Sequence, residues 1–275
     1  MVTIEEKLPC LKAKFQEMAD DGVLQGPLVI MRPPLPPSCL VLRCVRLGQG
    51  FSVPLPYMIR LLVIDNRDSF VYNIVQLLRE LPDISYELRQ EEALADEQLE
   101  GYDGLILSPG PGLPGDYPEM LRLVRLALEH GLPLLGVCLG HQALAETLGA
   151  QLYQLERPLH GHASQLVQLA ADPILGTEAS GRIIGRYHSW AVEAKSLPPC
   201  LEATALSGPL SSEVREEPVV MALRHRSRPA FGLQFHPESM ISQEGAGYIE
   251  RFVTLIAARL GQGAHFDQRI DYVLP

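Results

Sequence analysis

From Met58 onward, short apolar runs alternate with segments whose apolar residues recur at helical spacing. Residues 61–65 form a run typical of a buried strand, and the apolar positions of 70–81 fall on one helical face before Pro82. Asp68 or Ser69 is predicted to cap this helix. Strands joined by helices pair in parallel, so the alternation predicts an α/β fold: a mostly parallel, doubly wound sheet with helices on both faces.

The same alternation continues as far as Gly149. Strands are predicted at 86–88, 104–108 and 132–138, and helices at 118–130 and 140–148. After Gly149 the apolar runs are short, at 165–169, 182–187, 201–206, 219–224 and 231–235, and a last helix is predicted at 247–260. Short strands without intervening helices are typical of antiparallel pairing, so we expect a short antiparallel strand region beside the parallel sheet.

Residues 1–57 differ from the rest of the chain. They hold three of the five cysteines and the proline-rich run 32–38, and only 4–18 has helical character. We expect residues 1–57 to be an atypical N-terminal extension, which is either disordered or precedes the true start of the protein at Met58. The alternative is that these residues form an arm that docks onto a partner. The folded domain is then 58–263, followed by a C-terminal tail at 264–275.

Charge and cysteine content exclude several classes of protein. The 275 residues carry 33 Asp and Glu against 23 Lys and Arg, a net charge of -10, which gives no electrostatic basis for binding nucleic acid or an anionic membrane. No apolar run approaches the roughly 20 residues of a membrane-spanning helix. The five cysteines show no paired spacing, which argues against a disulfide framework or zinc site, so we expect a cytoplasmic protein.

A cysteine lies at the junction of a predicted strand and helix. Gly136 and Gly140 flank Cys138 in the pattern G-x-C-x-G, which is the arrangement of a nucleophile elbow with sulfur in place of the usual hydroxyl. The helix N-terminus beneath the sulfur favours a thiolate, and the N–H of Leu139 would point at an oxyanion. A buried structural cysteine is the alternative, but the two glycines and the strand-to-helix position favour a nucleophile.

A thiol nucleophile needs a base, and the base needs an acceptor that orients it. His236 follows the predicted strand 231–235, and Glu238 lies two residues further on, where the chain can turn back toward the imidazole. Together with Cys138, these residues predict a Cys-His-Glu triad.

The loop Ser108–Gly112 (SPGPG) also follows a predicted strand, which places it at the sheet edge expected for Cys138. Its backbone is a candidate source of a second oxyanion donor, and an ordinary turn is the alternative. The phosphate-binding pattern G-x-x-x-x-G-K-[ST] is absent from the sequence, which argues against nucleotide hydrolysis.

The three motifs 136–142, 235–239 and 108–112 together resemble the signatures of the class I, triad-type glutamine amidotransferases. Within that family, the segments 65–70 (DNRDSF), 72–73, 160–161 and 186–189 look like the amidotransferase subunit of anthranilate synthase and aminodeoxychorismate synthase. The resemblance covers the chain from Met58 to the last helix and leaves the extension outside.

The resemblance implies roles for individual residues. Cys138 would be the nucleophile, His236 the general acid and base, and Glu238 the residue that orients it. The glutamine and oxyanion site would be lined by Gly110, Pro111, Gly112, Leu139, Gln142, Ser189 and Trp190. The implied partners are glutamine and a chorismate-using synthase subunit that receives the ammonia; this chain would need no cofactor or metal, and the synthase would need Mg²⁺.

Three positions depart from the pattern of the family. His162 stands where lysine is usual, Trp190 where leucine is usual, and Arg67 where tyrosine is common. The first puts a partner contact in doubt and leaves the chemistry intact. Two other functions stay open: a stand-alone cysteine hydrolase of the nucleophile-elbow type, and a non-catalytic regulatory subunit with the same fold. The choice between anthranilate and aminodeoxychorismate stays open too.

Overall fold

A computed structural model describes residues 42–47, 51–56, 58–90, 96–210 and 217–266. The chain divides into two compact units, Met58–Arg259 and a second made of Met1–Tyr57 with Leu260–Pro275. In the second unit, β1 (Leu42–Leu47) and β2 (Phe51–Pro56) pair antiparallel, two strands that the sequence did not predict. The helix predicted at 4–18 lies outside the described residues, and the proposed domain boundaries stay predictions.

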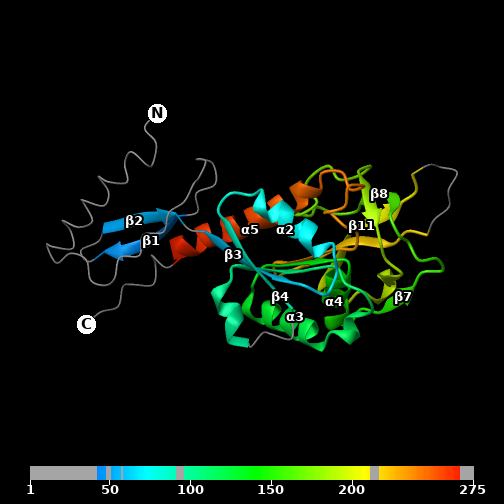
Figure 1. The fold of residues 1–275 in the computed structure, drawn as a ribbon, viewed down its shortest axis with the longest axis horizontal. Coiled ribbons are helices and arrows are strands. Elements are labelled where there is room, and N and C mark those ends of the chain that lie inside the picture. The colour runs from blue at the N-terminus through cyan, green and yellow to red at the C-terminus, as the bar shows by residue number, and fades with distance from the viewer. Residues whose placement is uncertain (1–41, 48–50, 57, 91–95, 211–216, 267–275) are drawn as a thin grey trace. The chain divides into compact units, whose positions relative to one another are not determined.

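A nine-stranded sheet organises the unit Met58–Arg259, in the order β4-β3-β5-β6-β13-β12-β11-β8-β9 (Figure 1). The first five strands pair in parallel: β4 (Ile84–Arg89), β3 (Ile59–Ile64), β5 (Gly104–Leu107), β6 (Leu134–Val137) and β13 (Ala230–Leu233). The others pair antiparallel: β12 (Val220–His225), β11 (Leu201–Gly208), β8 (His162–Gln168) and β9 (Ile183–Arg186). The predicted mostly parallel sheet with an antiparallel region is confirmed.

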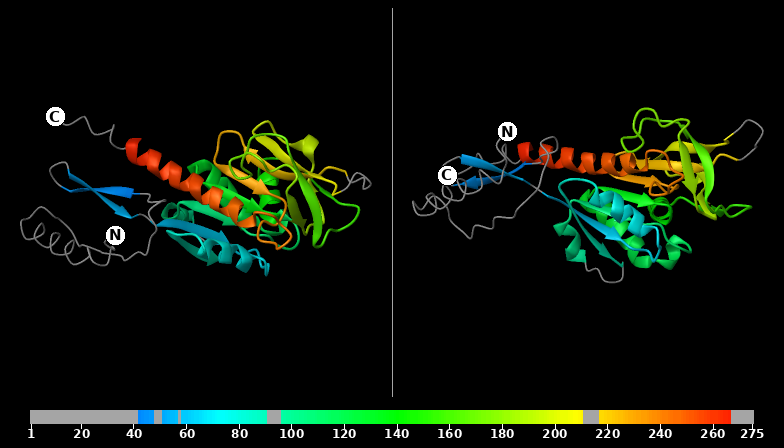
Figure 2. Two further views of the ribbon diagram at one scale, coloured as in Figure 1. Left: turned by 90° about the horizontal axis from the view of Figure 1, so that it is seen from above. Right: turned by 45° about the horizontal axis from the view of Figure 1, so that its top comes forward.

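Helices cover both faces of this sheet (Figures 1 and 2). Helices α3 (Pro118–His130) and α4 (Leu139–Thr147) lie on one face, and α2 (Val71–Arg79) and α5 (Gly245–Phe266) on the other. In the part of the chain that the structure describes, 3-10 turns lie at η2 (Asp96–Gly101), η3 (Pro114–Asp116) and η4 (Ala194–Ser196). The doubly wound arrangement is therefore confirmed.

Helix α3 shows how local sequence sets an element. Its buried residues Met120, Leu123, Val124 and Ala127 recur at helical spacing and face the sheet. Pro118 begins the helix, where a missing N–H costs nothing, and Gly131 ends it with φ 66, a left-handed conformation that glycine adopts without a Cβ clash. The bounds predicted for this helix, 118–130, are those observed.

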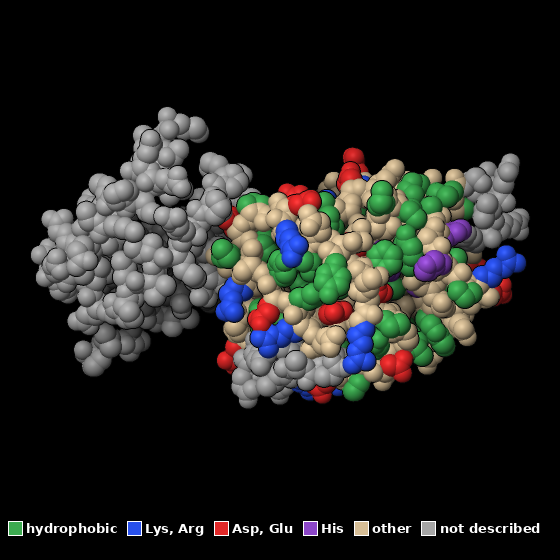
Figure 3. Space-filling view, viewed as in Figure 1, with side chains coloured by type: hydrophobic (Ala, Val, Ile, Leu, Met, Phe, Trp, Pro, Cys, Tyr) green, Lys and Arg blue, Asp and Glu red, His purple; other side chains and the backbone are tan. Residues whose placement is uncertain are grey.

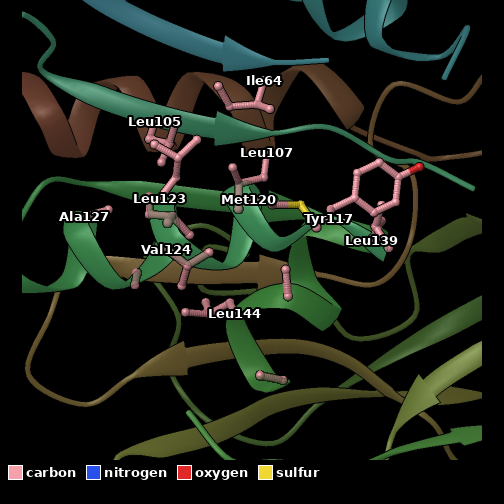
Figure 4. Close-up of a cluster of buried hydrophobic side chains, with 14 of the residues drawn as sticks. Ile64, Leu105, Leu107, Tyr117, Met120, Leu123, Val124, Ala127, Leu139 and Leu144 are labelled. Atoms are coloured by element: carbon pink, nitrogen blue, oxygen red, sulfur yellow. The ribbon is translucent and has the colours of Figure 1, made fainter. Parts of the chain in front are cut away.

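A large part of the core lies between the sheet and helices α3 and α4 (Figure 4). Strand residues Leu105 and Leu107, helix residues Leu123 and Leu144, and Tyr117 all belong to this buried cluster. Each large side chain buried here contributes about 1.5–3 kcal/mol, so the cluster holds α4 firmly against the sheet.

One expectation is wrong, and one pair of strands lacks a prediction. Helix α2 has Phe70 at its N-cap with no side-chain cap, whereas Asp68 accepts the Phe70 N–H at 2.8 Å and so stabilises the turn before the helix. The small antiparallel pair of β7 (Leu152–Gln154) and β10 (Trp190–Val192) was not predicted, because three-residue strands leave too short a pattern.

The surface carries mixed charge. Basic and acidic side chains are interspersed over the face of the described residues seen in Figure 3. Of the helices in the described part of the chain, none has the length and apolar character needed to span a membrane.

Candidate active site

Cys138 occupies a strained turn between β6 and α4. Its φ of 52° and ψ of -99° lie outside the regions that a non-glycine residue ordinarily adopts. Two hydrogen bonds hold the turn: the Cys138 N–H donates to the Leu233 carbonyl at 2.7 Å, and the Cys138 carbonyl accepts the Gln142 N–H at 3.1 Å. The chain therefore makes the sharp strand-to-helix turn that the sequence predicted at Cys138.

The flanking glycines are required by close approach of the backbone. A Cβ on Gly140 would lie 2.6 Å from the Leu107 carbonyl oxygen, and a Cβ on Gly136 would lie 2.3 Å from the Gly140 carbonyl oxygen. No other residue type fits between β5, β6 and α4 at these positions. The two glycines thus bring the helix N-terminus directly beneath Cys138.

His236 and Glu238 form a buried pair just after β13. The His236 Nδ1 lies 2.7 Å from the Glu238 Oε1, and these residues are 1% and 9% exposed. Because a carboxylate only accepts, Nδ1 carries the hydrogen and Nε2 faces outward from the pair. The Gly185 carbonyl accepts the His236 N–H at 3.0 Å, which fixes the backbone of the base.

The free nitrogen of His236 interacts with Cys138. Burial by itself lowers the pKa of His236, but the negative charge of Cys138, hydrogen bonding to its sulfur and the contact with Glu238 raise the pKa to about 10. By standard geometry Nε2 has no hydrogen-bond partner among the described residues, so its interaction with the sulfur is longer or less well aligned than a normal hydrogen bond. The structure thus brings Cys138, His236 and Glu238 together and favours the protonated form of His236.

Aromatic side chains surround the imidazole. The rings of Tyr187 and Phe70 lie 4.9 Å and 5.3 Å from that of His236, and the Tyr187 hydroxyl lies 3.1 Å from the Ser239 Oγ. The sequence did not assign these contacts, because neither aromatic residue carries chemistry of its own. They hold the ring plane of His236 by packing.

The SPGPG loop contacts the beginning of α4. A Cβ on Gly110 would lie 2.5 Å from the Leu139 Cδ2, so the loop lies against the residue after the nucleophile. The Pro111 carbonyl accepts the Tyr117 hydroxyl at 3.0 Å, and Gly112 has a positive φ of 76°. As the first residue of α4, Leu139 has an N–H without an intrahelical acceptor.

The remaining predicted residues lie on α4 and at β10. Gln142 donates from Nε2 to the Trp190 carbonyl at 2.8 Å, and the Ser189 carbonyl accepts the Leu155 N–H at 2.8 Å. The Tyr187 carbonyl lies 4.0 Å from the Cys138 sulfur, so the connection from β9 to β10 passes beside the nucleophile. That Gly110, Pro111, Gly112, Leu139, Gln142, Ser189 and Trp190 bind glutamine stays a prediction.

Known proteins resemble this chain in sequence. Residues 62–256 match the family model described as glutamine amidotransferase class-I. The chain belongs to this family. The amidotransferase is 37% identical to the anthranilate synthase component 2 of Azospirillum brasilense over 195 residues, 70% of this chain and 94% of the relative. It is also 37% identical to the aminodeoxychorismate synthase component 2 of Serratia marcescens over 194 residues, covering 70% and 98%.

A solved structure has the same fold. The crystal structure of a candidate GMP synthase subunit from Thermoplasma acidophilum superimposes with a TM-score of 0.63 at 24% identity, covering 74% of the amidotransferase and 96% of that chain. At this identity the likeness concerns the fold alone.

The structure also reveals polar residues of the amidotransferase that sequence reasoning passed over. Gln234 is fully buried, and its Nε2 lies 3.6 Å from the Cys138 sulfur. Asn66 is buried and holds the SPGPG loop, donating from Nδ2 to the Ser108 carbonyl at 2.8 Å. The available signal for Gln234 was a single polar residue in the apolar run 231–235.

Proposed function

We propose that this chain is the glutaminase subunit of a chorismate-using synthase, hydrolysing glutamine through a Cys138 thioester and passing the ammonia to the synthase subunit in the cytoplasm. The observation that carries the proposal is the buried arrangement of Cys138, His236 and Glu238 at a nucleophile elbow. Family membership supports the same class of chemistry.

The first half of the reaction forms the thioester. The Cys138 sulfur attacks the side-chain carboxamide carbon of glutamine, and the carbonyl electrons move to oxygen, where the Leu139 N–H donates to the oxyanion. As the oxyanion collapses, the C–N bond breaks and His236 transfers its Nε2 proton to the departing nitrogen. Ammonia leaves, and the glutamyl group stays on sulfur.

The second half releases glutamate. His236, now neutral, takes a proton from water as the water oxygen attacks the thioester carbon. Collapse of the second oxyanion expels the sulfur as a thiolate and restores the imidazolium beside it. Acid and base assistance of this kind contributes about 10² to 10⁴ in rate, and one oxyanion donor about 2.7–4 kcal/mol.

The partner is proposed from the names of the relatives. Component 2 proteins of anthranilate synthase and of aminodeoxychorismate synthase are both 37% identical to this chain. We therefore propose that it binds a chorismate-using component I that requires Mg²⁺, while this chain requires no cofactor. Formation of anthranilate and of aminodeoxychorismate are both compatible with the site, because the chorismate chemistry would occur in the partner.

The test is substitution of the nucleophile in the complex with the synthase subunit. Cys138→Ala is expected to abolish product formation from chorismate and glutamine while leaving product formation with ammonium salts intact. Cys200→Ala is the matched control, since Cys200 is a partly exposed free cysteine in the same domain. Glutamine-dependent product formation by Cys138→Ala would refute the proposal.

Two further measurements test the two other functions. Full-rate glutamine hydrolysis by the isolated chain, unchanged by any chorismate enzyme, would identify a stand-alone cysteine hydrolase. Intact partner binding together with no labelling of Cys138 by a glutamine-like alkylating agent would identify a regulatory subunit.

A further inference from the structure

Gln234 places a buried amide against the nucleophile. It follows β13, is fully buried, and brings its Nε2 to 3.6 Å from the Cys138 sulfur. We propose that Gln234 is a further catalytic residue, whose side-chain N–H donates to the anionic sulfur of Cys138 and holds it in position.

The orientation of the Gln234 amide is determined by its neighbours. The Trp190 carbonyl can only accept, so the Gln142 atom 2.8 Å from it is the nitrogen. The same nitrogen lies 3.1 Å from the Gln234 Oε1, to which it donates its other hydrogen. The second terminal atom of Gln234, the one facing Cys138, is therefore its nitrogen.

The guanidinium of Arg186, which is always protonated, lies at the far end of the hydrogen bonds that link Gln234, Gln142 and the Trp190 carbonyl. The Arg186 Nε donates to the His188 Nε2 at 3.2 Å, and the His188 Nδ1 lies 2.9 Å from the Trp190 carbonyl. Since a guanidinium only donates, His188 accepts at Nε2 and carries its hydrogen at Nδ1. Burial and the charge of Arg186 lower the pKa of His188 to about 3, which agrees with this neutral form.

The surroundings of the sulfur explain what this donor adds. The Tyr187 carbonyl, 4.0 Å from the sulfur, is placed to accept from a neutral thiol, whereas the Gln234 amide nitrogen, 3.6 Å away, is placed to donate to a thiolate. His236 gives up its proton in the first half-reaction and regains one in the second, whereas an amide does not titrate. The Gln234 N–H therefore remains available whenever sulfur carries negative charge.

The test measures the ionisation of Cys138 without glutamine. Gln234→Met keeps the length of the side chain and removes the donor, and the rate of alkylation of Cys138 by iodoacetamide is followed against pH. We expect the midpoint of that profile to rise by about one pH unit, so that about tenfold less thiolate forms at lower pH, because a hydrogen bond to the charged form favours it. Gln234→Glu should raise the midpoint further, since a carboxylate repels the thiolate.

A matched control separates loss of the donor from loss of structure. Thr204 is equally buried and lies on β11, another strand of the sheet. Its hydroxyl donates to the Asp172 carboxylate at 2.7 Å. Thr204→Val should lower the melting temperature while leaving the alkylation midpoint unchanged. A folded Gln234→Met protein with the wild-type midpoint would overturn the proposal.

A second measurement uses the wild-type protein, in case Gln234→Met does not fold. In protein labelled with ¹⁵N-glutamine, the side-chain amide protons of Gln234 should shift as Cys138 ionises, and should not shift in Cys138→Ala. Absence of the shift in wild type would also overturn the proposal. The inference rests on the proposed function only in taking Cys138 as the nucleophile; both readouts stay informative if glutamine is not the substrate.

Discussion

The carboxylate of Glu238 sets the strength of the proposed acid and base, and Glu238→Gln tests its contribution. The amide has nearly the same shape, and its oxygen can still accept the Nδ1–H of His236 across the observed 2.7 Å. Only the negative charge is lost. Both residues are almost fully buried, so water does not replace the missing charge.

The magnitude follows from the change in hydrogen-bond type. A hydrogen bond to a charged group contributes about 1.5–3 kcal/mol and one between neutral groups about 0.5–1.5 kcal/mol. The midpoints of these two ranges differ by about 1.25 kcal/mol, which is close to the roughly 1.4 kcal/mol that corresponds to one pKa unit. The pKa of His236, about 10 in the native protein, should therefore fall by about one unit, and kcat/KM for glutamine by about tenfold.

The assay combines glutamine turnover against pH with an NMR titration of His236. Glu202→Gln is the control, because Glu202 pairs with Arg224 at 2.8 Å away from the triad and should leave both readouts unchanged. If Glu238→Gln shows the wild-type rate and the wild-type titration of His236, the charge of Glu238 has no part in the mechanism and the reasoning fails.

Two further predictions concern stability. Because the pKa of His236 is raised from 6.5 to about 10, its protonated form adds stability to the native protein. This stability is fully present below pH 6.5 and is lost as the pH rises through about 10. The free energy of unfolding in urea should therefore decline from about pH 6 to about pH 10.5, and a flat profile would contradict the prediction. Gly110→Ala should destabilise the protein by about 1–3 kcal/mol, because its Cβ would lie 2.5 Å from the Leu139 Cδ2 and 2.9 Å from the Asn66 carbonyl oxygen. Gly115→Ala is the control, since nothing lies within 4 Å of a Cβ at that position. Equal melting temperatures of the two variants in thermal unfolding would count against this packing.

Local signals account for the elements that could be predicted. The bounds of helix α3 can be predicted because its signals act between near neighbours in the chain. These signals are the helical spacing of its apolar residues, Pro118 at its start and Gly131 at its end. The elbow at Cys138 was predicted for the same reason, since two glycines beside a strand and a helix leave few conformations. The short strands β7 and β10 carry no such signal, because their stability comes from pairing with each other.

The amino-acid sequence by itself determined the layered α/β class and the strand-to-helix turn at Cys138, and through family motifs it predicts the three residues of the proposed triad. The tertiary structure decided that β13 pairs with β6, which brings His236 beside Cys138, and that Gln234 directs an amide nitrogen at the sulfur. Periodicity and turn preferences act between near neighbours in the chain, whereas strand order and buried hydrogen bonds depend on segments that meet only when the sheet forms.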